Sequence, residues 1–256
     1  MRHDFARTLN FAHRGARRAA PENTLAAFAK ALELGADGIE LDTSFSKDGV
    51  LVVCHNPEVD ETSNGSGRIH DFPLSALREL DFGGWFDPAF AGEKIPTLDE
   101  VFDLVGSRLL VNIEMKTVSL RSDGLEAGIT ALIARRNLYD QVIVSSFNPF
   151  ALRRLRRLDP RIETGLLYST DLPIYLRRAW LLPWVKPRAL HPEHVMVDAG
   201  TMAWAQRGGY DVNVWTVNEE ADMQRLLDLG VNSIITDVPD RLRRLIQAGS
   251  YTLDSR

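Results

Sequence analysis

The segment ELGADGIELD, residues 33–42, is matched in outline near the other end of the chain by DLGVNSIITD, residues 228–237. Each copy contains the end of a helical pattern, a glycine that stops the helix, and an apolar strand that finishes in aspartate. Because the same helix-to-strand joint occurs twice, the chain is predicted to be built from βα units.

Short apolar runs recur between helical patterns along the whole chain, and many are continuously apolar, as strands covered on both faces are. They predict strands over residues 9–12, 38–45, 50–54, 109–115, 142–146, 164–168, 195–197, 212–217 and 233–236. If 50–54 is a ribbon that follows the second strand, eight strands remain. Eight βα units in 256 residues predict an α/β protein with a closed (β/α)8 barrel of the TIM type. A doubly wound open sheet is the alternative, because strand order cannot be read from sequence.

One segment breaks the alternation of predicted strands and helices. Residues 56–96 contain two glycine-rich stretches and only a short helical pattern. We interpret them as a small insertion after the second strand, near the mouth of one barrel domain that spans residues 1–256. Long loops in compact domains are often functional.

Composition narrows the class of protein. The net charge is −5, whereas nucleic-acid binders usually carry a basic footprint, so no nucleic-acid partner is expected. Cys54 is the single cysteine, which fits a reducing compartment. The first ten residues lack the apolar core of a signal peptide, and no run of about 18 apolar residues exists. The sequence therefore predicts a cytoplasmic protein without a transmembrane segment.

Ionisable residues inside apolar strands are the sharpest chemical signal. Glu40 and Asp42 lie two apart in one predicted strand, and Asn112, Glu114 and Lys116 have the same spacing in another. Residues two apart in a strand point to one face. Buried carboxylates are unfavourable unless paired, and a shared divalent ion removes that penalty. Oxygen ligands favour Mg²⁺ or Ca²⁺. Buried salt bridges, such as Glu114 with Lys116, are the alternative.

Two histidines follow predicted strands and would reach the same barrel mouth. His13 begins the sequence HRG, and His55 follows the ribbon after the second strand. Two histidines can divide acid and base roles near neutral pH. Arg14 can bind a phosphate through two nitrogens. Asp237, which ends the last strand, is interpreted as a turn or cap residue.

Two further stretches favour surface roles. The basic run at residues 153–157 is interpreted as a solvated helix face. Residues 172–190 mix tryptophan and leucine with basic residues, a composition that allows contact with a membrane surface, although three prolines break any long amphipathic helix.

Short motifs in a fixed order complete the pattern. They are HRG at residue 13, PENT at 21, ELD at 40, KDGV at 47, HN at 55, DETSNGSG at 60, PTLDE at 96, NIEMK at 112, SSF at 145, VWTVN at 214 and TD at 236. This ordered set resembles the glycerophosphodiester phosphodiesterase family over residues 9–246. The resemblance implies a β/α barrel with a small insertion after the second strand.

The resemblance also implies roles for the individual side chains. Glu40, Asp42 and Glu114 would hold one divalent ion, and His13 and His55 would be the acid–base pair. Arg14 and Lys116 would bind the phosphate. The remaining residues that it places around the substrate are Glu22, Phe147 and Trp215.

The expected reaction is metal-dependent hydrolysis of a small-molecule glycerophosphodiester to glycerol 3-phosphate and an alcohol. Attack by water and attack by the glycerol 2-hydroxyl both fit the family geometry. The alternatives are a lysophospholipase D-type enzyme acting on lipids at a membrane surface, a barrel phosphodiesterase for inositol lipids, and a non-catalytic barrel that binds phosphodiesters.

Overall fold

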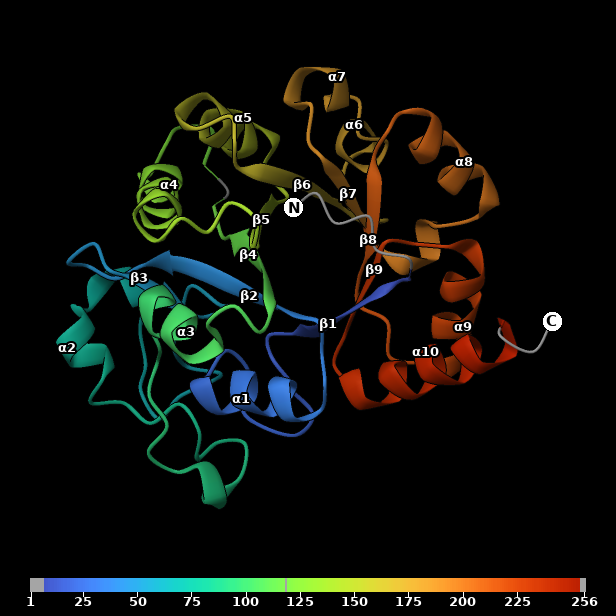
Figure 1. Ribbon diagram of the computed structural model, residues 1–256. Helices are drawn as coiled ribbons and strands as arrows, with labels where there is room; N and C mark the ends of the chain where they lie inside the picture. Colours follow the sequence, from blue (N-terminus) through green and yellow to red (C-terminus); the bar gives the residue numbers. More distant parts are fainter. Residues whose placement is uncertain (1–6, 118, 254–256) are drawn as a thin grey trace.

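Eight parallel strands close into a barrel in the computed structural model, which describes residues 7–117 and 119–253 (Figure 1). Strand β1 (Leu9–His13) pairs in parallel with both β2 (Gly38–Phe45) and β9 (Ser233–Thr236). This double pairing closes the sheet, whose order is β1-β9-β8-β7-β6-β5-β4-β2 with β3 beside β2. The predicted barrel is therefore confirmed, and the open sheet is excluded.

The other elements alternate around this barrel. The remaining strands are β3 (Leu51–Val53), β4 (Leu110–Met115), β5 (Val142–Ser146), β6 (Glu163–Tyr168), β7 (Ala189–Pro192) and β8 (Asp211–Val214). The longer helices are α1 (Leu25–Glu33), α3 (Leu98–Val105), α4 (Leu125–Arg136), α5 (Pro149–Leu158), α8 (Ala199–Arg207), α9 (Glu220–Leu229) and α10 (Pro239–Leu253). Short helices are α2 (Leu74–Leu77), α6 (Ile174–Arg177) and α7 (Leu182–Val185), with 3₁₀ turns η1 (Ile69–Asp71), η2 (Pro88–Phe90) and η3 (His194–Met196).

Helix starts follow local chemistry in the sequence. The Thr97 hydroxyl accepts a hydrogen bond from the backbone N–H of Glu100, whose carboxylate in turn accepts the Thr97 N–H, which makes a capping box. Asn148 caps α5, and Pro149 occupies its first turn, where no backbone donor is needed. Asn148 places the beginning of α5 directly after the carboxyl end of β5, whereas α3 begins only after the segment 56–96.

A small apolar cluster lies among the strands on the inward face of the sheet. Leu9 and Phe11 of β1 pack with Ile235 of β9, and Leu110 and Trp215 complete the group. Alternation along β1 puts His13 on the same face as Leu9 and Phe11. The larger core lies between the outward face of the strands and the helices.

One predicted strand is wrong. Residues 195–197 were expected to form a strand, but β7 is Ala189–Pro192 and residues 194–196 form η3. β7 lies between β6 and β8, with Leu167 opposite His191. The fully buried imidazole of His191 breaks the apolar pattern on which the prediction depended. Val197 is buried all the same, because it packs in the outer core.

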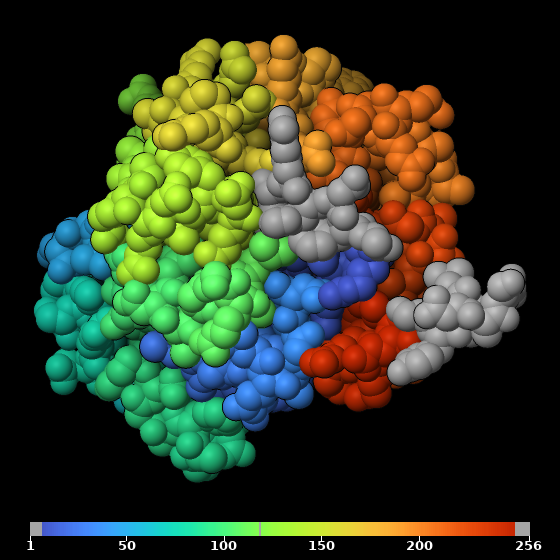
Figure 2. Space-filling view, in the orientation of Figure 1, coloured from blue at the N-terminus to red at the C-terminus, as the bar shows by residue number. Residues whose placement is uncertain are grey.

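The segment 56–96 has a small core of its own. β3 pairs antiparallel with β2 as the predicted ribbon, and Val52 and Cys54 pack with buried side chains of the segment, namely Val59, Ile69, Leu77, Phe82 and Ile95. In the space-filling view this segment forms the teal and green bulge at the lower left (Figure 2). It is anchored beside the carboxyl end of β2.

Candidate active site

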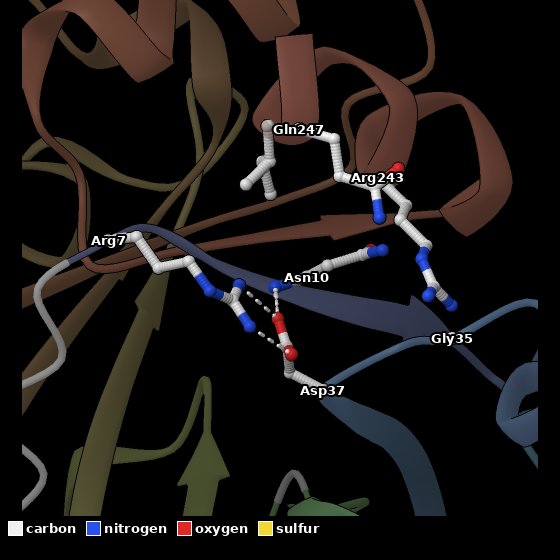
Figure 3. A pocket seen from close by; sticks show the side chains of 7 residues that line it. Arg7, Asn10, Gly35, Asp37, Arg243 and Gln247 are labelled. Atoms are coloured by element: carbon white, nitrogen blue, oxygen red, sulfur yellow. Dashed lines mark hydrogen bonds and ion pairs between the residues drawn. The ribbon is translucent and has the colours of Figure 1, made fainter. Parts of the chain in front are cut away.

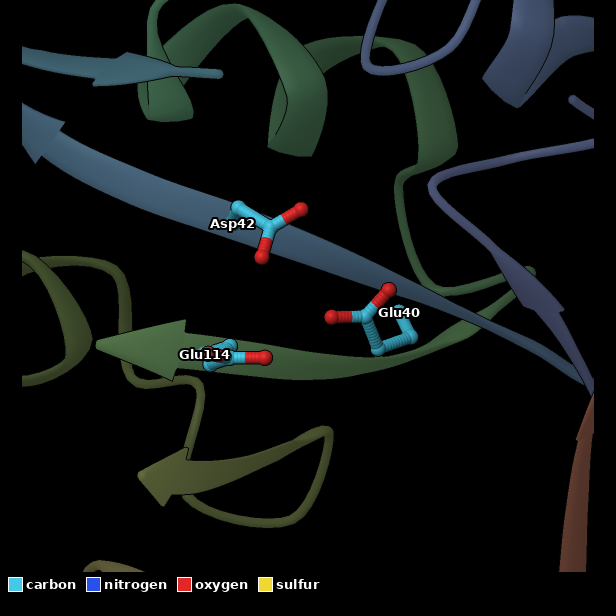
Figure 4. Close-up of side chains that lie close together, drawn as sticks. All are labelled: Glu40, Asp42 and Glu114. Carbon is cyan, nitrogen blue, oxygen red and sulfur yellow. The ribbon is translucent and has the colours of Figure 1, made fainter. Parts of the chain in front are cut away.

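Three carboxylates converge between neighbouring strands (Figure 4). Glu40 and Asp42 project from β2, and Glu114 projects from β4, directly across from Asp42 in the strand register. One oxygen of each lies within 4.8 Å of the others, and Asp42 is 1% exposed. Strand alternation produces this group, as the spacing of the residues predicted.

The cluster is electrostatically unfavourable in its all-ionised form. Burial, followed by the charges of Asp42 and Glu114, raises the pKa of Glu40 well above its usual range. Burial and the charge of Asp42 raise the pKa of Glu114 to about 7. Burial also disfavours ionisation of Asp42, but Lys116 and Arg14 outweigh it and lower the pKa of Asp42. The three carboxylates therefore repel one another, and their ionised forms need positive charge nearby.

Two cations offset part of this charge. Lys116 Nζ lies 3.1 Å from Glu114 Oε1 and 3.5 Å from Asp42 Oδ1. Arg14 Nε lies 3.5 Å from Asp42 Oδ2. The salt bridge expected as the alternative to a metal site, Glu114 with Lys116, is therefore present. It does not satisfy the cluster, because the buried Oδ1 of Asp42 has no hydrogen-bond donor.

A divalent ion fits this arrangement. Three carboxylates within reach of one point supply the hard oxygen donors that Mg²⁺ and Ca²⁺ prefer. An ion would also bind Asp42 Oδ1, which accepts no hydrogen bond, and would favour the ionised forms of Glu40 and Glu114. The donor set does not distinguish the two metals.

The loop between β1 and α1 wraps around the cluster in a tight turn. Arg14 and Gly15 both have positive φ, 54° and 80°, and the backbone N–H of Arg14 donates to Glu40 Oε2 at 3.1 Å. A β-carbon on Gly15 would lie 2.7 Å from Ala27, so only glycine fits. Arg14 also donates to Glu22 at 2.8 Å, and Glu22 is 9% exposed. Glu22 therefore positions Arg14 at the site.

The two histidines have different surroundings. His13 Nδ1 lies 2.7 Å from Asp237 Oδ1, and its Nε2 lies 3.9 Å from Glu40 Oε2. His55 Nδ1 lies 2.6 Å from the amide oxygen of Asn56. Burial lowers the pKa of His55, and the charge of Asp42 opposes that shift. In each ring an acceptor faces Nδ1, which leaves Nε2 free to give or take a proton.

Two aromatic side chains lie at the mouth, next to the ends of β5 and β8. Phe147, just after β5, and Trp215, just after β8, meet edge to face with ring centroids 5.4 Å apart. The Trp215 indole donates to the backbone oxygen of His191 at 2.7 Å. Asn213 contacts the His191 ring at 3.0 Å, and burial lowers the pKa of His191 to about 3. His191 is thus a neutral support beneath Trp215.

Sequence reasoning missed four residues that hold the site in place. Asp237, interpreted as a turn or cap residue, is the partner of His13, and Asn218 donates to its other oxygen at 2.9 Å. Arg17 pairs with Glu22 at 2.7 Å, and Asn23 donates to Asp42 at 3.0 Å. The matched segments that end in Asp42 and Asp237 were the available signal, since Asp42 lies within β2 and Asp237 directly follows β9 at the same mouth.

A separate cavity of about 260 Å³ opens at the opposite end of the barrel (Figure 3). It lies beside the beginnings of β1 and β2, where Arg7 pairs with Asp37 at 2.6 Å and Arg243 lies near Gly35. None of the residues proposed for the site lines it. The carboxyl ends of the strands, where β/α-barrel enzymes carry their active sites, therefore remain the candidate site.

Comparisons with known proteins define the class. The chain is 41% identical over 249 residues to a glycerophosphodiester phosphodiesterase of Caldanaerobacter subterraneus, which covers 95% of this chain and 99% of the relative. A phosphodiesterase of Oleispira antarctica, solved in complex with the product sn-glycerol-3-phosphate, superposes with a TM-score of 0.80 at 30% identity, covering 93% and 96% of the two chains. A glycerophosphodiester phosphodiesterase of Agrobacterium tumefaciens matches with the same TM-score and identity over 92% and 98%. The chain is therefore a phosphoric diester hydrolase on a β/α barrel.

The model of the glycerophosphoryl diester phosphodiesterase family matches residues 13–241. The chain belongs to this family, and the resemblance drawn from the ordered motifs is confirmed. Within the described part of the chain, no helix has the length and apolarity needed to cross a membrane.

Proposed function

We propose that the enzyme hydrolyses glycerophosphodiesters to glycerol 3-phosphate and an alcohol, with a divalent ion held by Glu40, Asp42 and Glu114. The carboxylate cluster beside His13 is the observation that carries this proposal, because it places metal donors and an acid–base group at one point. Phosphodiester hydrolysis needs both functions, since negative charge grows on the phosphate and the leaving alkoxide needs a proton. A bound ion supplies Lewis-acid stabilisation of that charge.

Arg14 and Lys116 are proposed to bind the phosphate. Both already contact Asp42, so both lie beside the carboxylate cluster. Glu22 and Arg17 hold the β1–α1 loop that carries Arg14. A planar guanidinium matches two phosphate oxygens, and the Lys116 ammonium adds a second positive charge.

The two histidines are proposed to divide the proton transfers. Burial lowers the pKa of His55 and so favours its neutral form, whose free Nε2 can accept a proton from the attacking hydroxyl. The Asp237 carboxylate beside His13 Nδ1 stabilises that ring when it carries two protons, so His13 can donate from Nε2 to the departing alkoxide. Each ring uses the nitrogen that its partner leaves free.

The glycerol end of the substrate is proposed to lie against Phe147 and Trp215, whose perpendicular rings form an apolar wall at the mouth. The product named for the Oleispira structure, sn-glycerol-3-phosphate, has the size and charge that this wall and the two cations would accept. The small-molecule substrate is thus favoured over a lysophospholipid, which none of the three compared proteins is named for. A cytoplasmic location and a domain spanning the whole chain stay predictions.

The test is release of glycerol 3-phosphate from glycerophosphocholine. EDTA should abolish release, and added Mg²⁺ or Ca²⁺ should restore it. Lysophosphatidylcholine serves as the parallel substrate. Full activity in EDTA would remove the metal from the proposal, and preference for the lysolipid would reassign the substrate.

A further inference from the structure

One segment of the chain carries charge of the opposite sign to the whole. Residues 149–188, which contain α5, β6, α6 and α7, include nine Lys or Arg and three Asp or Glu, a net charge of +6, while the chain carries −5. Three of these cations pair with carboxylates, Arg154 with Glu126, Arg161 with Asp159 and Arg188 with Asp211. Among the described residues, six have no carboxylate partner: Arg153, Arg156, Arg157, Arg177, Arg178 and Lys186.

The same segment exposes large apolar side chains. It holds six of the ten exposed large hydrophobic residues of the described chain, namely Phe150, Leu158, Ile174, Tyr175, Trp180 and Trp184. Trp180 is 60% exposed, although tryptophan is normally largely covered. Such a concentration on one region marks an interaction surface rather than scattered surface residues.

Direct contacts link several of these side chains. Phe150 and Trp184 meet with ring centroids 5.3 Å apart, and the Arg153 guanidinium lies 5.6 Å from the centre of a Trp184 ring. The Trp180 backbone is tied to Tyr175 by a hydrogen bond of 3.0 Å. We name the group the α5–α7 patch: Phe150, Ile174, Tyr175, Trp180 and Trp184 with Arg153, Arg177 and Arg178.

The patch lies on the side of the barrel formed by α5 and α7, which are adjacent (Figure 1). Phe150 follows the mouth residue Phe147 by three positions, in the first turn of α5. α6 begins a few residues after the carboxyl end of β6. The patch therefore begins at the rim of the active-site mouth.

We propose that the α5–α7 patch docks the enzyme onto an anionic phospholipid surface. Tryptophan and tyrosine favour the boundary between headgroups and acyl chains, because each has an apolar ring and a polar atom. Unpaired arginines next to them are attracted to anionic headgroups. Since the rest of the chain carries a net negative charge, a negative surface favours the orientation in which this patch faces it.

This inference goes beyond the proposed function, because hydrolysis of a dissolved glycerophosphodiester needs no membrane contact. It also differs from the interpretation of residues 153–157 as a merely solvated face. Arg153 packs over Trp184, so part of that run belongs to the aromatic surface. The short helices α6 and α7 fit docking at the surface rather than insertion, since each has only four residues, about one turn.

Co-sedimentation of the full chain with vesicles tests the proposal. Vesicles of two parts phosphatidylcholine and one part phosphatidylglycerol should carry the protein into the pellet, whereas pure phosphatidylcholine should leave it in the supernatant. High salt should release it, because screening weakens the attraction. Trp180→Ala and the double variant Arg177→Glu/Arg178→Glu should each lower binding by at least roughly tenfold.

Matched controls lie on α8, which contributes neither to the site nor to the patch. Trp204→Ala, 42% exposed in the native protein, and Arg207→Glu should bind anionic vesicles like the wild type. All variants should still hydrolyse glycerophosphocholine, which shows that they fold. Absence of binding to anionic vesicles, or an equal loss in the α8 variants, would overturn the proposal. Light scattering that shows the patch variants breaking an oligomer would instead make the patch a contact between copies of this chain.

Discussion

His13 Nδ1 lies 2.7 Å from Asp237 Oδ1, although 224 positions separate the two residues in the chain. The contact joins the ends of the first and last barrel strands, which pair side by side. Asn218 holds Asp237 from the other side through its amide N–H and accepts the Asp237 backbone N–H. The His13 ring thus has a fixed orientation, with Nε2 facing Glu40.

Replacing this carboxylate tests whether it positions His13. In Asp237→Asn, an amide can face Nδ1 with its N–H₂ group and favour the wrong tautomer of the imidazole. We expect kcat for glycerophosphocholine to fall by up to about 10⁴-fold, with KM changed much less. Asp240→Asn, which removes an exposed partner of Arg244, is the control. A change in KM alone would mean that Asp237 acts on substrate binding and not through His13.

His55→Ala tests the proposed general base. Loss of the neutral imidazole should lower kcat by about 10²- to 10⁴-fold. His55, whose Nδ1 contacts Asn56, is the group proposed to take that proton, and no other described residue is proposed to replace it. His70→Ala, an exposed histidine near Asp71, should leave the rate unchanged. Steady-state kinetics decide between the roles, since an unchanged kcat with a raised KM would make His55 a phosphate contact.

The metal-free protein should lose stability as pH rises from about 4.5 to about 7. Glu114 has a pKa near 4.5 in the unfolded chain and about 7 in the folded protein. Between these values the folded state binds more protons than the unfolded state, so the free energy of unfolding falls with pH. The pKa of Glu40 is raised as well and acts in the same direction. Urea unfolding in EDTA across this range measures the slope.

Glu114→Gln supplies the matched comparison for that slope. The amide cannot ionise, so the variant in EDTA should be more stable than the wild type at pH 7 and less sensitive to pH. Added Mg²⁺ or Ca²⁺ should stabilise the wild type most at the upper end of the range, because the ion needs deprotonated carboxylates. A variant that gains as much stability from the ion as the wild type would exclude Glu114 as a ligand.

Substitutions of two glycines distinguish the effect of backbone strain on stability from the effect of close packing. Gly15 and Gly49 have nearly the same φ, 80° and 77°, but a β-carbon on Gly15 would meet Ala27 at 2.7 Å, whereas one on Gly49 meets nothing within 4 Å. Gly49→Ala should lower the free energy of unfolding by about 1–2 kcal/mol, the strain of a left-handed alanine.

Gly15→Ala should be destabilised further and should also lose activity, because the displaced loop carries Arg14 and its hydrogen bond to Glu40. Thermal melts and kinetics on both variants check the difference. Equal effects of the two substitutions would show that the loop tolerates the displacement and that its tight turn is unimportant for the site.

The sequence by itself determined the fold class and predicted most of the side chains that the structure brings together at the proposed site. Continuously apolar strands separated by capped helices can be covered only in a parallel α/β arrangement, and the two-residue spacing of Glu40 with Asp42 fixes their shared face. The same local logic, together with the order of the motifs, predicted roles for Glu114, His13 and His55. The prediction missed β7, because the buried His191 interrupts the apolar pattern by which strands were recognised.

Only the tertiary structure decided how distant segments meet. Closure of the barrel depends on β1 pairing with both β2 and β9, and hydrogen-bonded pairing between strands leaves no local signal in the sequence. Closure in turn brings Asp237 to His13 and gives the terminal aspartate of the last strand a partner other than a metal. The exposure of Trp180 beside unpaired arginines is also a property of the folded surface, since a run of mixed residues does not reveal which side chains face water.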